Sequence, residues 1–211
     1  MPLQKIQWTD HQCGWALWHI TEPEEILTAM ALPDVCPGNI VSLSKRLEWL
    51  GGRILLKMLV QKAGLPYLGL LKDEFGKPSL DQQIHHISLS HSFPFVAAQI
   101  DSQAVGIDVE QPKDKLLRIA HRVFNPAEEK DAGKDIIKNC VYWCAKEALY
   151  KIHGQGGISF SKNLKIEPFT LARQGDLQGK ISLGGSDHLI NLGYSAKEDL
   201  VIVYTKTSSP K

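Results

Sequence analysis

The chain has 211 residues, of which 43% are hydrophobic and 22% are charged. These values are typical of a folded protein with a sizeable core, and they exclude disordered, collagen-like and coiled-coil classes. The formal net charge of +1 argues against nucleic acid as a partner. The charge is unevenly distributed, because residues 1–44 carry one lysine against five carboxylates, whereas residues 45–77 carry seven basic residues against three carboxylates.

Cysteine usage and the apolar pattern indicate a reducing compartment. The four cysteines form no Cys-x-x-Cys pair and are too sparse for a disulfide framework, and no His/Cys grouping has convincing zinc-ligand spacing. The N-terminus shows no secretory pattern, and no apolar run approaches the ~20 residues of a membrane helix. We therefore expect a cytoplasmic protein with no membrane partner.

The first half of the chain predicts helices followed by strands. Thr21 and Glu24 have the spacing of a capping box that opens a short helix. Gly64 ends a longer helix whose apolar residues recur at helical spacing. The predicted elements, in chain order, are a helix to residue 30, a helix over 44–63, a strand over 87–90 and a more apolar strand over 95–100.

The second half begins with a strand over residues 104–110 and continues with helices and antiparallel strands. Asn125 followed by Pro126 and Glu128 is typical of a helix start. The other predicted elements are a long helix over 135–153, alternating strands around 181–183, 189–192 and 200–204, and a hairpin turn at Gly184-Gly185.

The order helix, loop, strand, serine, strand occurs twice. Trp49-xxx-Arg53-xxx-Lys57 lies in the first long helix, and Trp143-xxx-Glu147-xxx-Lys151 lies in the second. The identity between the copies is too low to establish a duplication from the pattern alone. A duplication would give two similar α+β halves that meet near residues 103–105, with a ligand cleft between them.

Asp108 and Glu110 are the first candidates for chemistry. Residues i and i+2 of a strand project to the same face, so the two carboxylates lie side by side while Val109 and its apolar neighbours face the core. A divalent cation relieves the repulsion of adjacent carboxylates, and Mg²⁺ binds one or two of them together with substrate phosphates. The alternative is an exposed polar strand face that ends at Gln111.

Glu147 and Lys151 form a second candidate pair on the long helix. An i, i+4 surface ion pair is the alternative and is worth only a few tenths of a kcal/mol. On a helical wheel both residues fall at the edge of the apolar face, where charges are partly buried and need a partner or a function. Lys146 points away from that face and is expected in solvent.

A third group lies in the first half. Ser90 and His91 are neighbours on a strand and point opposite ways, so they make a poor nucleophile–base pair but could both contact phosphate. The alternative is two polar residues at a strand end. Lys77, in the turn Gly76-Lys77-Pro78, is a candidate phosphate contact because it accompanies the basic block.

Together these motifs resemble the 4′-phosphopantetheinyl transferase superfamily in its long, two-half, surfactin-synthetase-activating form. The resemblance is carried, in order, by Gly76-Lys77-Pro78, Ser88-Leu89-Ser90-His91-Ser92, Gly106-Ile107-Asp108-Val109-Glu110, Phe124-Asn125-Pro126-Ala127-Glu128 and the helix from Trp143 to Lys151. It implies an α+β pseudo-dimer of two similar halves, each a small antiparallel sheet packed on a long helix, with the site in the cleft between them. The N-terminal half (1–104) would contact coenzyme A phosphates, and the C-terminal half (105–211) would hold the metal and catalytic residues.

The resemblance also implies a role for each candidate. Asp108, Glu110 and Glu147 would hold Mg²⁺ or Mn²⁺, and Glu147 and Lys151 would be catalytic. The implied contacts to coenzyme A are Arg46, Arg53, Lys77, Ser90, His91, Asp108 and Lys151, with His91 at the 3′-phosphate. Trp143 and Phe124 would pack rather than react.

The implied activity is Mg²⁺-dependent transfer of 4′-phosphopantetheine from coenzyme A to a serine of an apo acyl or peptidyl carrier protein, with release of 3′,5′-ADP. The implied enzyme is a monomer, because one chain supplies both halves. Two alternatives remain: another metal-dependent enzyme that cleaves phosphodiesters, and a non-catalytic module that binds carrier proteins.

Overall fold

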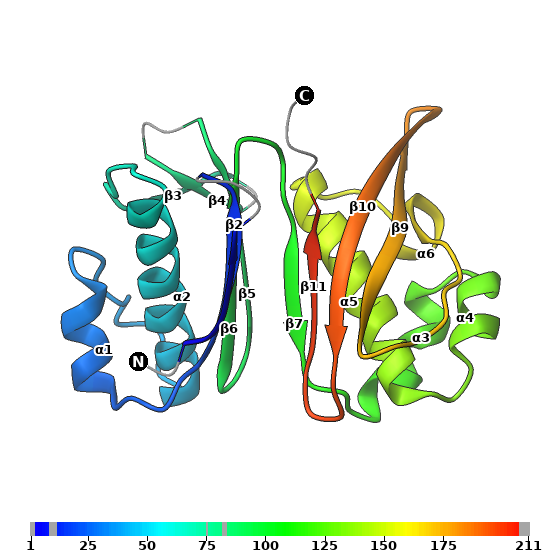
Figure 1. Cartoon of the computed structure of the whole chain (residues 1–211), viewed down its shortest axis with the longest axis horizontal. Helices are drawn as coiled ribbons and strands as arrows, with labels where there is room; N and C mark the ends of the chain where they lie inside the picture. Colours follow the sequence, from blue (N-terminus) through cyan, green and yellow to red (C-terminus); the bar gives the residue numbers. More distant parts are fainter. Residues whose placement is uncertain (1–2, 9–11, 75, 82–83, 207–211) are drawn as a thin grey trace. The chain divides into compact units, whose positions relative to one another are not determined.

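The computed structural model describes residues 3–8, 12–74, 76–81 and 84–206. The chain divides into two compact units, one ending at Val105 and the other beginning at Gly106 (Figure 1). This division lies one residue from the boundary expected from the sequence. Each unit combines helices with antiparallel sheet, which confirms the α+β class. That the two units form a pseudo-dimer with a shared cleft stays a prediction.

The N-terminal unit contains a four-stranded antiparallel sheet in the order β1-β2-β6-β5. These strands are β1 (Leu3–Trp8), β2 (Gly14–His19), β5 (His86–Ser92) and β6 (Phe95–Asp101). Two short strands, β3 (Leu70–Lys72) and β4 (Pro78–Leu80), pair with each other. The helices are α1 (Glu24–Ala31) and α2 (Leu43–Lys62).

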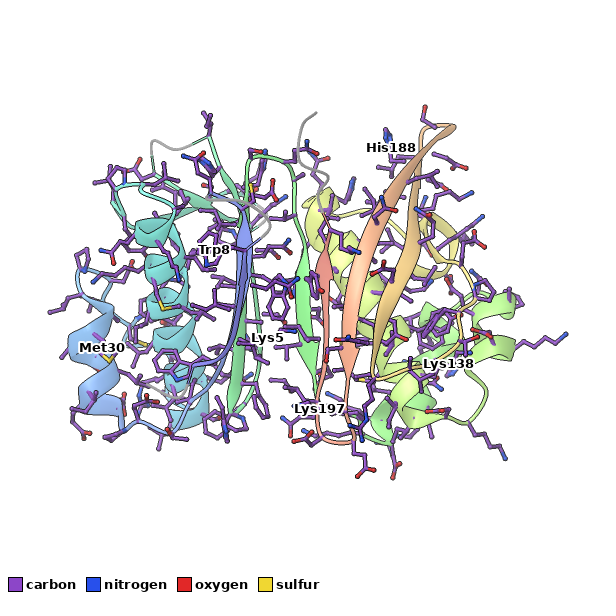
Figure 2. All side chains as sticks on the ribbon, viewed as in Figure 1. Lys5, Trp8, Met30, Lys138, His188 and Lys197 are labelled. Carbon is purple, nitrogen blue, oxygen red and sulfur yellow. The ribbon has the colours of Figure 1, made fainter. Side chains whose placement is uncertain are left out.

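The long helix α2 packs against the sheet because one of its faces is almost entirely apolar. Its leucines and isoleucine join Trp18 of β2 and Val96 of β6 in a single buried cluster. Gly51 permits the close approach, since a Cβ there would lie 2.8 Å from Cδ1 of Ile20. Met30 of α1, labelled in Figure 2, packs against the same cluster.

The C-terminal unit contains a five-stranded antiparallel sheet in the order β7-β11-β10-β9-β8. Its strands are β7 (Ile107–Glu110), β8 (Leu164–Ile166), β9 (Gln174–Leu183), β10 (Ser186–Ala196) and β11 (Val201–Thr205). Its helices are α3 (Lys115–Val123), α4 (Pro126–Ala132), α5 (Ile136–His153) and α6 (Phe160–Asn163). The central α5 forms a second core with residues of these strands.

Several local predictions are confirmed. The Asn125 side chain caps α4 in a full capping box with Glu128. The β9–β10 hairpin turns at Gly184 and Gly185, which both have positive φ, as a tight hairpin turn favours. Helix α2 differs from its predicted range by one residue at each end, and α5 begins one residue later than predicted.

Other local predictions are wrong or incomplete. Helix α1 begins after Pro23 rather than at a Thr21 capping box, because the Thr21 hydroxyl bonds the neighbouring Glu22 carboxylate instead. The strands β1 and β2 and the helix α3 were not predicted. For β2 the reason is that almost every position is buried, so its sequence shows no apolar–polar alternation. Among the described residues, no helix is long and apolar enough to cross a membrane.

Candidate functional site

The two carboxylates of β7 face helix α5. Asp108 pairs with Val203 of β11, and Glu110 pairs with Val201. Paired residues of antiparallel strands share a face, and both valines belong to the core around α5. The apolar residues Val105, Ile107 and Val109 are buried as predicted. The expectation that the carboxylates lie on an outer face is wrong, because they lie on the side of α5 and Asp108 is buried.

Gly106, the residue just before β7, lets the chain pass close to α5. A Cβ at this position would lie 1.9 Å from the carbonyl oxygen of Ala148, which is backbone and cannot rotate away. The main chain of Gly106 is also tied to Thr205: its N–H donates to the threonine Oγ1 over 2.8 Å, and its carbonyl accepts from the Thr205 N–H over 3.0 Å. The glycine thus brings β7 and its carboxylates directly against the helix that carries Glu147.

Lys151 of α5 is held by β7. Its Nζ lies 2.7 Å from Oδ1 of Asp108 and donates to the carbonyl of Ile107 over 2.8 Å. The Lys151 side chain is 25% exposed and that of Asp108 only 9%, so the pair is only partly screened by water. The predicted neighbours Asp108 and Lys151 are thus brought together by packing between a strand and a helix 43 residues later.

The charges of Asp108 and Lys151 also act on the carboxyl group of Glu147. Burial is the largest cause that raises the pKa of its carboxyl, followed by the negative charge of Asp108, while Lys151 opposes the shift. Glu110 adds a smaller repulsion, and the pKa of Glu147 reaches about 7. A carboxyl with such a pKa can accept and release a proton near neutral pH, which is the property of a general base.

The donor set of this cluster fits a divalent cation. Burial, together with the negative charges of Asp108 and Glu110, raises the pKa of Glu147, and carboxylate oxygens are the ligands that Mg²⁺ prefers. In the structure Asp108 is engaged by Lys151, and Glu110 lies 3.3 Å from Nζ of Lys115. Within the described ranges no three acidic, histidine or cysteine side chains already converge on a metal position.

The helical-wheel prediction that Lys146 lies in solvent is wrong, because its side chain is fully buried. Its Nζ lies 2.7 Å from Oε2 of Glu128 and donates to the carbonyls of Phe160 and Leu164. The same Glu128 accepts from the Ile166 N–H over 2.8 Å and closes the capping box of α4. This buried network ties α5 to α4 and β8, next to Glu147 in the sequence.

The remaining side chains around α5 are structural. All four cysteines are free thiols, and Cys140 and Cys144 are buried as expected. Burial raises the pKa of Cys144, and hydrogen bonds to Cys140 and Asp108 add to the shift, so the thiol stays protonated. Trp143 stacks on Phe160 and Phe124 contacts Tyr142, which confirms both as packing residues. Lys138, labelled in Figure 2, pairs with Asp131.

A second group of predicted residues lines a pocket of about 490 Å³ in the N-terminal unit. Arg53 of α2 and Ser90 and His91 of β5 all contribute to its wall. Gly76 and Pro78, the residues that flank Lys77, line it as well. Three segments far apart in the sequence thus converge on one pocket. The full lining is Ile40, Lys45, Glu48, Trp49, Gly52, Arg53, Gly76, Pro78, Leu89, Ser90 and His91.

Arg53 in this pocket and Lys77 beside it are partly desolvated. The guanidinium of Arg53 lies over the ring of Trp49, with its Cζ 4.4 Å from the ring centroid. Burial lowers the pKa of Arg53, and burial likewise lowers that of Lys77. Within the part of the chain that the structure describes, Nε of Arg53 is buried without a hydrogen-bond partner. A cation that has lost water and keeps an unused donor is suited to bind an anion.

Arg46 is not brought to this pocket. Its Nε lies 2.5 Å from Oε1 of Glu24, and its two terminal nitrogens donate to Glu24 and to the Val41 carbonyl. This bidentate pair fastens α1 to the start of α2. In the structure Arg46 is therefore paired with the carboxylate of Glu24, whereas the family resemblance implied a contact with a phosphate.

Glu48 is a residue of this pocket that the sequence analysis missed. Its side chain is 4% exposed and lies near Lys45, His91 and the N–H of Phe93. Burial opposes its ionisation, but hydrogen bonds from His91, Lys45 and Phe93 lower the pKa of Glu48 to about 2. The feature of the sequence that could have revealed Glu48 is its position: it is a carboxylate on the face of α2 that is otherwise apolar.

Comparisons with a family model and with individual known proteins point to the same family. The family model described as the 4′-phosphopantetheinyl transferase superfamily matches residues 104–204. The 4′-phosphopantetheinyl transferase Sfp of Bacillus subtilis strain 168 is 34% identical over 119 residues, which cover 54% of this chain and 51% of Sfp. The transferase gsp of Aneurinibacillus migulanus is 32% identical over 114 residues, 51% of this chain and 48% of gsp.

A shorter relative is covered more fully. The 4′-phosphopantetheinyl transferase AcpT of Salmonella typhi is 31% identical over 137 residues, which cover 61% of this chain and 69% of AcpT. The chain spans only about half the length of Sfp and gsp. The matched region contains the β7 carboxylates and the α5 residues described above. The chain therefore belongs to the 4′-phosphopantetheinyl transferase superfamily.

Proposed function

We propose that this chain transfers the 4′-phosphopantetheine arm of coenzyme A to a serine of an apo acyl or peptidyl carrier protein and releases 3′,5′-ADP. The observation that carries the proposal is the contact of β7 with α5, where Asp108 pairs with Lys151 beside a Glu147 whose pKa is about 7. The family model of the 4′-phosphopantetheinyl transferase superfamily matches residues 104–204, the region that contains this contact. In this proposal the N-terminal unit contacts the coenzyme A phosphates, and the C-terminal unit supplies the catalytic and metal-binding residues.

In the proposed mechanism Glu147 is the general base. Its burial and the nearby charges of Asp108 and Glu110 make the neutral form accessible near pH 7, so the carboxylate can take the proton of the carrier serine as its oxygen attacks the β-phosphorus of coenzyme A. Lys151 is directly paired with Asp108. Its ammonium would neutralise the phosphate of the departing 3′,5′-ADP.

The same carboxylates are the proposed metal ligands. Asp108, Glu110 and Glu147 would hold Mg²⁺, with Mn²⁺ as a substitute, since their mutual repulsion is relieved by a divalent cation. When bound, the metal would neutralise charge on the pyrophosphate. Lys115, 3.3 Å from Glu110, would be the side chain that moves aside or shares that carboxylate.

The pocket of the N-terminal unit is the proposed site for the nucleotide phosphates. Arg53, Ser90 and His91 line it, and Lys77 lies between two lining residues. The unused Nε donor of Arg53, the only such arginine nitrogen among the described side chains, supports an anionic ligand here. Arg46 is left out of this set because Glu24 holds it.

We further propose a monomer that acts in the cytoplasm. All four cysteines are free, which suits a reducing compartment. Each unit has its own buried core, so one chain can supply both parts of the proposed activity.

The test is to incubate the protein with coenzyme A, Mg²⁺ and an apo carrier protein and to weigh the carrier by mass spectrometry. A gain of one phosphopantetheine group supports the proposal, and Asp108→Ala should abolish that gain. Cleavage of coenzyme A without a carrier would indicate a phosphodiester-cleaving enzyme instead. Carrier binding with no modification of several different carriers would indicate a non-catalytic module.

A further inference from the structure

The carboxylate of Glu48 connects helix α2 to the strand that carries His91. Its Oε2 lies 3.2 Å from Nδ1 of His91 and 2.7 Å from Nζ of Lys45, and its Oε1 accepts from the Phe93 N–H over 2.9 Å. Glu48 is 4% exposed, whereas the His91 side chain is 51% exposed. A buried group with three partners therefore holds an exposed imidazole at the edge of the pocket.

This contact decides which nitrogen of His91 a ligand would meet. Because Nδ1 donates to the carboxylate, the remaining ring nitrogen, Nε2, is the one that a bound anion would use. With Nδ1 carrying a proton, Nε2 donates to an anion only when the ring is an imidazolium. The contact with Glu48 therefore fixes the orientation of the imidazole ring through Nδ1.

Glu48 itself is unsuited to touch an anion. Its negative charge would repel a phosphate, and both of its oxygens already accept hydrogen bonds from within the unit. Besides Glu48 itself, the charged residues that line the pocket with His91 are Lys45 and Arg53, both from α2. Glu48 balances part of this positive charge while it fixes the direction of the imidazole.

We propose that Glu48 is a positioning residue that orients His91, so that the pocket recognises the 3′-phosphate of coenzyme A. This inference rests on the proposed function, because it takes the pocket to be the coenzyme A phosphate site. It adds a residue that contacts no substrate. The predicted consequence is discrimination between coenzyme A and dephospho-coenzyme A, which lacks that phosphate.

Isothermal titration with each of the two nucleotides, without a carrier protein, tests the inference. Glu48→Gln should weaken binding of coenzyme A roughly tenfold, the effect of losing a hydrogen bond to a charged group. The affinity for dephospho-coenzyme A should stay within about twofold, because no phosphate then reaches His91. His91→Ala should reproduce the loss, and the double variant should bind no more weakly than His91→Ala alone.

Glu25→Gln, on the exposed first turn of α1, is the matched control and should bind both nucleotides like the parent protein. Circular dichroism and thermal melting check that each variant folds. If Glu48→Gln does not fold, Glu48→Asp decides, since it keeps the charge and only withdraws the carboxylate from Nδ1. It should weaken coenzyme A binding by less than tenfold and leave dephospho-coenzyme A binding unchanged.

Three results would overturn the inference: unchanged affinity for coenzyme A in the folded Glu48 variant, equal losses for both nucleotides, or a Glu48 effect that adds fully to that of His91→Ala. The carrier modification assay separates this outcome from failure of the proposed function. Parent protein that shows the expected nucleotide discrimination but modifies no carrier would contradict the transferase activity and leave the role of Glu48 intact.

Discussion

The ammonium of Lys151 lies 2.7 Å from Oδ1 of Asp108, although the two residues are 43 positions apart in the chain. One residue comes from the helix that forms the core of the C-terminal unit and the other from the edge strand of its sheet. The pair therefore links the packing of this unit to the chemistry proposed for it.

Lys151→Met should remove this link. We expect transfer to fall at least about 100-fold, because the leaving phosphate loses its cation. The free energy of unfolding should fall by about 1–2 kcal/mol, because the buried Asp108 loses its ammonium partner. Lys180→Met is the matched control, since Lys180 pairs with an exposed Asp187, and should leave the free energy of unfolding nearly unchanged. Urea denaturation measures both, and equal effects would contradict the special role of the Asp108 pair.

Glu147→Gln should abolish transfer and yet stabilise the metal-free protein. The pKa of Glu147 is about 7 in the folded chain against an ordinary value of 4.5, so the folded state binds an extra proton between these limits. Stability of the parent protein should therefore fall as pH rises from about 4.5 to 7, by about 1–3 kcal/mol. The glutamine cannot ionise and avoids this loss. Denaturation in the presence of a chelator at pH 5 and pH 8 should show the variant ahead only at pH 8; an advantage of the same size at both values contradicts the assignment.

Lys146→Met should destabilise the protein more than any exposed lysine change. It leaves the carboxylate of Glu128 buried without its cation, which costs about 3–5 kcal/mol. The double variant Lys146→Met/Glu128→Gln should recover part of this loss, because the uncompensated charge is gone. A double-mutant cycle by urea denaturation measures the coupling, and simple additivity of the two changes would contradict a direct pair.

Gly106→Ala should prevent β7 from packing on α5. The added Cβ would lie 1.9 Å from the backbone oxygen of Ala148, so strand and helix must separate. We expect a loss of about 3 kcal/mol or more in the free energy of unfolding, together with loss of transfer. Gly156→Ala is the control, because a Cβ there meets nothing within 4 Å. A folded, active Gly106→Ala protein would contradict the close approach.

The sequence by itself determined the α+β class, the two long helices and the capped start of α4, because these depend on local periodicity and on capping chemistry. It also singled out Asp108, Glu110, Glu147 and Lys151, since charged residues beside apolar faces stand out in a linear pattern. It could not reveal β2, whose uniformly buried residues carry no alternation.

Tertiary structure decided what each charged residue touches. From the sequence, Lys146 was expected in solvent and Arg46 at a phosphate. In the structure, the packing of α5 on α4 buries Lys146 against Glu128. The packing of α1 on α2 pairs Arg46 with Glu24. Glu48 passed unnoticed because its partner His91 lies on a strand 43 residues away. Burial and pairing over such separations are set by how whole elements pack, and the charge of a residue in the sequence does not specify the partner that neutralises it.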